Sequence, residues 1–180
     1  MMRDEITTER LFLRPYRWGD ITDVLRYADD EEWARFLPVP VPYSARDAEQ
    51  FLARLTLTDR LQQPSWAIIL ENRVVGGITV RFLFDHRVAE IGYSISRESW
   101  DRGYMTEAAR AVVDEAFSCY EQLARIRSHA DVRNKASIRV MEKIGMTFEG
   151  CLRSDRYIRG ELVDDAYYGI LRAEWNARRA

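Results

Sequence analysis

The chain has 180 residues, 47% hydrophobic and 12% aromatic, which is enough for one domain with a full core and too few for two comfortable domains. It carries 27 Lys and Arg against 29 Asp and Glu, a net charge of −2. This balance argues against a nucleic-acid binder that relies on bulk positive charge and against a disordered polyelectrolyte.

The chain has only two cysteines, Cys119 and Cys151, far apart in sequence, and no apolar export segment precedes the domain. No run approaches the roughly 18 apolar residues of a membrane span. We therefore expect one domain over residues 1–180, a reduced cytoplasmic location, and neither a nucleic-acid nor a membrane partner.

In the first half of the chain the hydrophobic pattern changes from helical to extended near Pro64. Ser44 and Asp47 form a capping box that predicts a helix start, and three prolines before it stiffen a loop. Gly76 and Gly77 indicate a bulge or a close backbone approach. The expected elements are a strand over 11–14, a helix over 20–28 with Asp20 as its acidic N-cap, the loop over 37–42, a helix from 44 to near 64, and strands over 66–70, 74–80 and 88–95.

The second half alternates helices and strands. Apolar residues from Ala108 to Phe117 keep helical spacing, and Gly145 is expected to end a later helix. The expected elements are that long helix, a strand over 124–130, a helix over 137–144, and strands over 147–157 and 162–171. The resulting order, β-α-α-β-β-β-α-β-α-β-β, predicts an α/β layered domain with a mixed, largely antiparallel sheet.

The segment from Trp100 to Ala108 lies between a strand and the start of the long helix. A glycine turn there can present backbone N–H groups at the positive end of a helix dipole, which suits a pyrophosphate. Arg97 and Arg102 would add counter-charge. The alternative is an ordinary turn in which Gly103 only supplies an unusual backbone angle.

A second segment runs from Asn134 to Met146. Asn134 is expected to cap the helix, an apolar stripe to bury it, and Gly145 to end it, so a structural account of the segment is complete. Neither segment alone reveals an activity.

Together and about 30 residues apart, the two segments resemble motifs A and B of the Gcn5-related N-acetyltransferase (GNAT) superfamily, in particular its RimJ/RimL-type branch. The matches are Glu90-Ile91-Gly92-Tyr93, the run 100–108, and Asn134, Ser137, Val140, Lys143 and Gly145; the ends of the chain also resemble the branch. Two positions depart from the pattern. Asp101 replaces a glycine and puts a carboxylate beside the predicted diphosphate, and Met146 replaces a phenylalanine of the core.

The resemblance implies a GNAT-like sheet with helices on both faces and acetyl-CoA as the acyl donor. The two histidines and two cysteines have no metal-ligand spacing, so we expect no metal site. The implied contacts are Arg97, Arg102, Gly103, Tyr104, Met105 and Thr106 around the diphosphate, and Tyr93, Ser94, Ile95 and Asn134 along the pantetheine, with Ser137 near the thioester sulfur.

Acetyl transfer to an amine needs a neutral nitrogen and a proton donor for the leaving thiolate. At pH 7 roughly one α-amine in seven is neutral, against about one lysine in 2,500, so an α-amine needs little help from a base. Glu90 is our candidate base, acting through water; its alternative role is a salt-bridged or edge carboxylate. Ser137 is the candidate proton donor; its alternative role is a helix cap.

Trp33 and Phe36 could wall the acceptor pocket or belong to the core, and Asp164 could bind an ammonium or be an ordinary strand charge. The acidic run 29–32 could attract a cationic amine or be a solvated helix end.

The sequence thus predicts an N-acetyltransferase for a primary amine, with a protein N-terminus as the leading acceptor. The alternatives are a small-molecule amine (polyamine, amino sugar, antibiotic or amino acid) and a non-catalytic acyl-CoA sensor. Edge strands near the C-terminus could support a homodimer.

Overall fold

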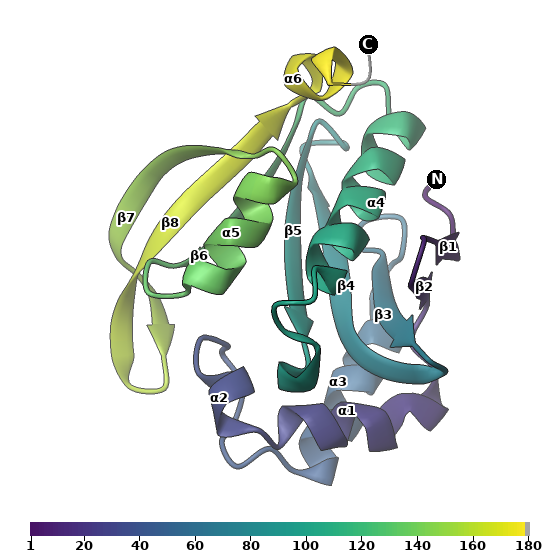
Figure 1. Cartoon of the computed structure of the whole chain (residues 1–180), viewed down its shortest axis with the longest axis vertical. Helices are drawn as coiled ribbons and strands as arrows, with labels where there is room; N and C mark the ends of the chain where they lie inside the picture. Colours follow the sequence, from purple (N-terminus) through teal and green to yellow (C-terminus); the bar gives the residue numbers. More distant parts are fainter. Residues whose placement is uncertain (179–180) are drawn as a thin grey trace.

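An eight-stranded sheet runs through the computed structural model, which describes residues 1–178 (Figure 1). The strand order is β1-β2-β3-β4-β5-β6-β8-β7, and every neighbouring pair is antiparallel except β5 and β6. The strands are β1 (Ile6–Thr7), β2 (Phe12–Arg14), β3 (Ser65–Leu70), β4 (Arg73–Leu83), β5 (Val88–Ile95), β6 (Arg125–Asp131), β7 (Thr147–Ile158) and β8 (Glu161–Leu171). The mixed, largely antiparallel sheet predicted from the sequence is confirmed.

Six α-helices accompany the sheet in the described residues. They are α1 (Ile21–Ala28), α2 (Glu31–Ala34), α3 (Ala45–Leu57), α4 (Tyr104–Cys119), α5 (Lys135–Lys143) and α6 (Arg172–Ala177), with 3-10 turns at Trp18–Asp20 and Arg97–Ser99. The predicted order holds with three additions, β1, α2 and α6. Each of these is at most six residues long, too short to leave a periodic pattern in the sequence.

Two sequence predictions about the helices were wrong in detail. The second predicted helix, α3, ends at Leu57 and not near Pro64, because Thr58 takes an extended backbone conformation. Leu61, which would have prolonged its apolar stripe, is about half exposed. Asp20 does stand at the N-cap of α1, but its carboxylate makes no cap to that helix and pairs with Arg14 instead.

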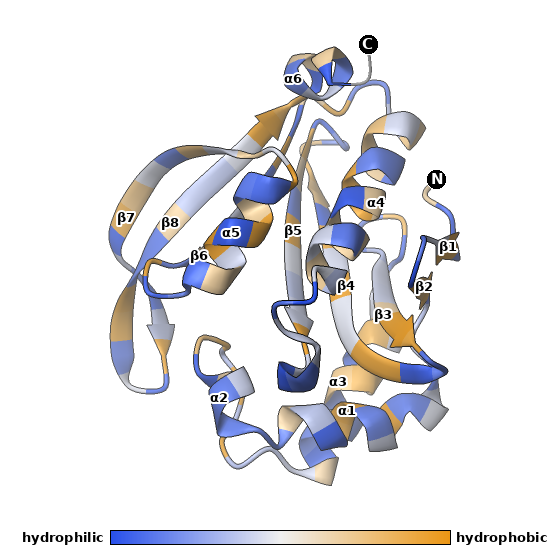
Figure 2. Ribbon diagram, in the orientation of Figure 1, coloured by the Kyte–Doolittle hydropathy of each residue, from blue (hydrophilic) through white to orange (hydrophobic). Residues whose placement is uncertain are grey.

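Helices pack on both faces of the sheet, as predicted. Alternation along β3 sends Trp66 and Ile68 into the core under α4, and Ala67 and Ile69 into the core under α1 and α3. Helices α1, α4 and α5 each turn a hydrophobic side to the sheet and a hydrophilic side to solvent, which gives their mixed colouring in Figure 2.

The Gly76-Gly77 pair marks a bulge with a close backbone approach. The β3–β4 register shifts between Ile68 and Ile69. A Cβ on Gly76 would lie 2.4 Å from the carbonyl oxygen of Ser94 on β5. Only glycine fits there, so β4 can lie against the end of β5.

Candidate active site

The site is built around a split between β5 and β6. These strands pair in parallel over three positions only, from Val88 opposite Arg125 to Glu90 opposite Arg127. At the vertex of the split, where the two strands separate, Ser128 Oγ donates a hydrogen bond of 2.9 Å to the carbonyl of Ile91. Beyond it both strands continue without pairing to each other, so the edge of β5 that carries the predicted Tyr93, Ser94 and Ile95 is open to an extended ligand.

The predicted diphosphate loop follows β5 and leads into α4. Gly103 has φ +78°, and α4 begins at Tyr104 without a side-chain cap. Its first backbone N–H groups, at Tyr104, Met105 and Thr106, are therefore left for an anion at the positive end of the helix dipole. Arg102 is exposed beside them. The structure thus brings the predicted loop residues to the end of the split.

Residues of the N-terminal segment hold this loop in place through hydrogen bonds to Glu107 and Arg102. The carboxylate of Glu107 accepts hydrogen bonds from Thr8 Oγ1 (2.6 Å), Arg10 N (2.8 Å) and Arg10 Nε (2.7 Å). Arg10 also donates to the carbonyl of Arg102. Burial raises the pKa of Glu107, but these hydrogen bonds outweigh burial and hold its pKa below the ordinary value.

Asp101, the departure from the family pattern, has φ +57°. The position therefore uses the left-handed conformation that its usual glycine favours, and aspartate tolerates it better than most residues. Its carboxylate is exposed and lies 3.5 Å from Arg139 of α5. The counter-charge at this position comes from Arg139.

The start of α5 lies against β5 at Tyr93. The Tyr93 hydroxyl donates to the carbonyl of Ser137 (3.1 Å) and accepts from Ser137 Oγ (3.2 Å). Asn134 caps α5, since its Oδ1 accepts from Ser137 N (3.1 Å), and its amide NH2 group is a further donor. Burial raises the pKa of Tyr93, so its hydroxyl stays protonated at neutral pH and can donate.

Glu90 lies at the vertex, on the sheet face opposite Tyr93. Its Oε1 accepts from Arg81 (2.6 Å) and its Oε2 from Arg127 (3.0 Å). A carboxylate held between two guanidinium groups matches the salt-bridged alternative for this residue.

The residues predicted for the acceptor do not form one pocket wall. Trp33 of α2 is buried between Tyr27 and Tyr43, with ring centroids 5.3 and 6.4 Å away. Its indole N–H is buried without a partner. Phe36 is half-buried beside the Arg35 guanidinium.

Asp164 lies on β8, where its Oδ1 accepts from Ser154 N at a bulge of β7. Arg97, predicted for the cofactor, lies 3.7 Å from Asp30 and thus connects the loop after β5 with the start of α2.

Sequence reasoning missed the residue that holds the β7–β8 hairpin to α2. Arg159, in the β7–β8 turn, donates to the carbonyls of Ala34 (2.7 Å), Arg35 (2.8 Å) and Leu37 (3.1 Å). These oxygens belong to α2 and the residues just after it, so the hairpin tip is held to α2. No local pattern announces such a contact; the only signal was an arginine beside a glycine in a hairpin turn.

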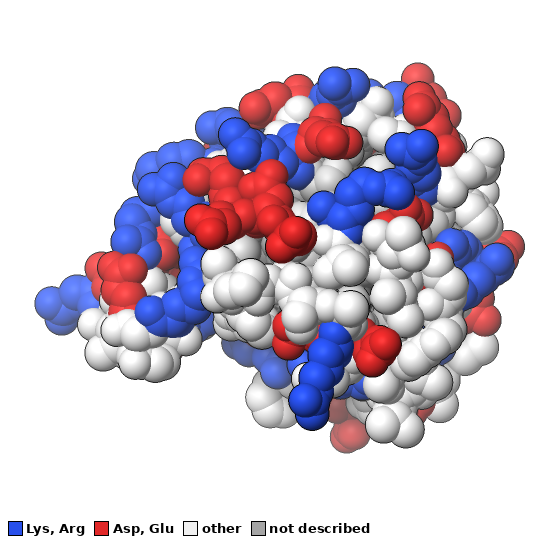
Figure 3. Space-filling view, turned by 90° about the horizontal axis from the view of Figure 1, so that it is seen from below, with Lys and Arg blue, Asp and Glu red and all other residues white. Residues whose placement is uncertain are grey.

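Figure 3 looks onto the end of the molecule that carries α1 and α2 and shows acidic side chains gathered beside basic ones. The exposed acidic residues at this end include Asp29, Glu31 and Glu32. Their exposure is compatible with both interpretations of the acidic run 29–32, a solvated helix end and a surface that attracts a cationic amine.

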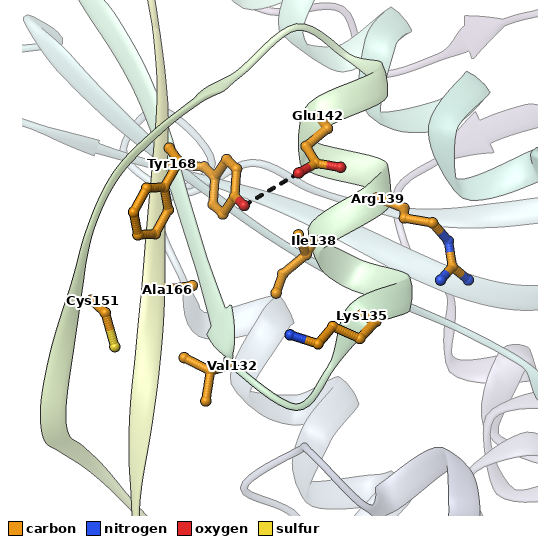
Figure 4. Close-up of a pocket in the computed structure, with 9 residues that line it drawn as sticks. Val132, Lys135, Ile138, Arg139, Glu142, Cys151, Ala166 and Tyr168 are labelled. Carbon is orange, nitrogen blue, oxygen red and sulfur yellow. Dashed lines mark hydrogen bonds between the residues drawn. The ribbon is translucent and has the colours of Figure 1, made fainter.

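A separate groove of about 430 Å³ lies between α5 and the β7–β8 hairpin (Figure 4). Its walls include Ile138, Phe148 and Tyr168, whose hydroxyl donates to Glu142 (3.4 Å). None of the predicted site residues lines this groove. Its lining residues come from α5, β7, β8 and Val132, and none comes from α4.

Residues 1–178 contain neither a group of metal ligands nor a membrane-spanning helix. No three His, Cys, Asp or Glu side chains there are grouped as a metal ion would require. No helix in that range is long and apolar enough to span a membrane.

A sheet that splits between two parallel strands, with an uncapped helix start beside the split, matches the acyltransferase fold that the sequence resemblance predicted. Comparison with known proteins agrees. Residues 10–147 match the family model described as the acetyltransferase (GNAT) domain. The chain therefore belongs to the GNAT superfamily, in its RimJ/RimL-like family, and is an N-acetyltransferase.

Full-length relatives support this assignment. The uncharacterized N-acetyltransferase YnaD of Bacillus subtilis is 31% identical over 95% of this chain and 99% of its own. A crystal structure of a GNAT-family acetyltransferase from Bacillus anthracis is 31% identical, with a TM-score of 0.84 over 94% of this chain and 99% of that one.

RimL, a ribosomal L7/L12 α-N-protein acetyltransferase solved with coenzyme A, shares the fold at 18% identity, with a TM-score of 0.81 over 93% of this chain and 97% of that one.

Proposed function

We propose that this N-acetyltransferase takes acetyl-CoA as donor and a protein N-terminal α-amine as acceptor. The observation that carries the proposal is the open edge of β5, which runs between the uncapped start of α4 and the Tyr93–Ser137 pair. When bound, acetyl-CoA supplies the activated acetyl group.

The chain's own groups fit such a donor. The N–H groups that open α4 would hold its diphosphate, assisted by Arg102, and the Asn134 amide and the edge of β5 would hold its amide-bearing arm. Ser137 Oγ, already hydrogen-bonded to Tyr93, would donate a proton to the leaving thiolate.

The preference for an α-amine rests on two supports. A RimL structure with the same fold carries that activity in its name, and the exposed acidic residues near α2 would attract a cationic N-terminus.

The proposed location is the cytoplasm, because two unpaired cysteines fit a reducing compartment.

The test is a thiol-release assay with acetyl-CoA and a panel of acceptors. The panel holds short peptides with free N-termini, the same peptides already N-acetylated, a polyamine, an amino sugar and an amino acid. We expect release with the free peptides only, and mass spectrometry should find the added acetyl group on the α-nitrogen. Turnover with small amines and none with peptides would refute the protein acceptor and favour the small-molecule class.

Glu90→Gln tests the base predicted from the sequence. If Glu90 takes up the proton through water, turnover should fall by about 100-fold. If it serves only to pair Arg81 and Arg127, thermal stability should fall while turnover stays within about threefold of the wild-type rate. The two interpretations therefore predict different measurements on one variant.

A further inference from the structure

A second polar cluster lies at the split, on the face away from α5. Glu90 and Arg127 are the last paired residues and point to one face of the sheet. His129 follows Arg127 by two positions on β6 and so points to that same face. Tyr93 is three positions after Glu90 and points to the other face, where it meets Ser137 of α5. His129 is thus the first residue of β6 beyond the vertex that faces away from the proposed proton donor.

A buried carboxylate orients the imidazole. His129 Nδ1 lies 3.2 Å from Oδ2 of Asp165 on β8, whose side chain is 0% exposed. Arg156 of β7 donates to both oxygens of Asp165, its Nη2 at 2.7 Å from Oδ1. An ionised carboxylate only accepts hydrogen bonds, so in the neutral imidazole this contact puts the proton on Nδ1 and the lone pair on Nε2.

The surroundings leave that lone pair available. The ring of His129 stacks on Tyr167, with centroids 5.0 Å apart and planes 17° apart, and its side chain is 23% exposed. Because Nδ1 contacts Asp165 of β8, Nε2 is the ring nitrogen that remains to accept a proton from a substrate. Glu90, by contrast, has both oxygens engaged by guanidinium groups.

We propose that His129, held by Asp165, is the proton acceptor for the incoming amine. The inference rests on the proposed function, because it needs the acetyl group near the vertex. The amine nitrogen bonds to the acetyl carbon as the carbon–sulfur bond breaks. The surplus proton on nitrogen passes to His129 Nε2, the thiolate takes a proton from Ser137, and solvent then carries the proton from His129 back to Ser137. The amine then arrives from the face opposite the leaving group's proton donor.

The test compares His129→Asn with His86→Asn. The first variant keeps a donor near Asp165 and removes the basic nitrogen; the second changes the chain's other histidine, which lies beside Phe82 and Tyr120 away from the split. With the best acceptor of the panel, His129→Asn should lower kcat by about 100-fold and leave acetyl-CoA affinity within about threefold. His86→Asn should keep the wild-type rate. Added imidazole should restore part of the turnover of His129→Ala, which a merely structural role would not allow.

A spectroscopic reading is independent of turnover. With only two histidines, imidazole-labelled protein gives two sets of signals, and His86→Asn assigns them. The acidic limb of kcat/KM should follow the titration of His129 and vanish in His129→Asn. The charged and titratable groups around it are Glu90, Arg127, Asp131, Asp155, Arg156, Asp165 and Tyr167. Burial and a hydrogen bond to Asp155 raise the pKa of Tyr167 to about 12, so Tyr167 does not produce that limb.

The outcomes separate the two proposals. A wild-type protein that binds acetyl-CoA but acetylates no peptide would overturn the proposed acceptor. A wild-type enzyme that acetylates peptides while His129→Asn keeps its rate and its acidic limb would overturn the role of His129 alone.

Discussion

The Tyr93–Ser137 pair allows the sharpest test of how the thiolate receives its proton. Tyr93→Phe removes one donated and one accepted hydrogen bond, at 3.1 and 3.2 Å, and Ser137→Ala removes only the second. At about 1 kcal/mol for each partly buried bond, the losses should be about 2 and about 1 kcal/mol. These correspond to melting-temperature decreases of roughly 4–8 °C and 2–4 °C for a chain of this size.

The effect on turnover distinguishes a relay from two separate roles. Loss of a proton donor costs about 100-fold in turnover, near 2.7 kcal/mol. If the proton passes through Tyr93 and Ser137 in series, each single variant and the double variant should all lose about 100-fold. If the two hydroxyls act separately, the double variant should lose about 10,000-fold.

The measurement is steady-state thiol release for the four proteins of the cycle, with calorimetry on each. Ser65→Ala is the matched control, since its hydroxyl also pairs with another hydroxyl, that of Thr79 at 2.9 Å, on a strand two positions from β5. It should lose similar stability and keep its turnover. Multiplicative losses in the double variant would refute the relay, and unchanged turnover in both single variants would remove the pair from the chemistry.

Three further changes probe the supports of the site. Asn134→Asp keeps the oxygen that caps α5 and loses the amide donor, so calorimetric binding of CoA should weaken about tenfold with little change in melting temperature. Arg159→Ala frees three carbonyls near α2, so KM for the acceptor should rise several-fold while CoA affinity is kept. Glu107→Gln should be less stable than wild type at pH 7 in urea titrations. Folding lowers the pKa of Glu107 below its unfolded value near 4.3. The difference in free energy of unfolding between the two proteins is therefore present above pH 4.3 and should disappear as the pH falls through the lower pKa of the folded state.

Local patterns were enough to predict most of the fold. The capping box at Ser44 forms as expected, with Ser44 Oγ accepting from Asp47 N and Asp47 accepting from Ser44 N. The limits of β5 agree with the prediction residue for residue, and Gly145 ends α5 with φ +94°. Each of these features depends on neighbours within a few residues. The short elements β1, α2 and α6 depend instead on tertiary contacts and left no pattern.

The sequence predicted the site only where its geometry depends on residues close together in the chain. Motif spacing brought Asn134, Ser137 and the loop before α4 together in the prediction, and in the structure Arg139 of α5 lies 3.5 Å from Asp101 of that loop. The partners of Glu90 and His129 are set by strand pairing across 37 and 36 residues of sequence. Their register follows from where β5 and β6 separate and from the bulges of β7, which no periodicity reports.

Because the chain is nearly neutral, binding of the proposed anionic donor depends on groups within the site itself. A net charge of −2 gives no long-range attraction for an anionic donor. Affinity must then come from backbone N–H groups at the start of α4, and these hold their geometry because Thr8 and Arg10 lock Glu107 from outside.

The proton-handling groups are divided between the two faces of the split: Ser137 on the α5 side and His129 on the other. Groups on one face share a hydrogen bond and should couple, whereas groups on opposite faces share none and should not. The combination Ser137→Ala with His129→Asn should therefore multiply its losses, while Ser137→Ala with Tyr93→Phe should not. If both double variants behaved alike, the separation of the two proton transfers by the sheet would be refuted.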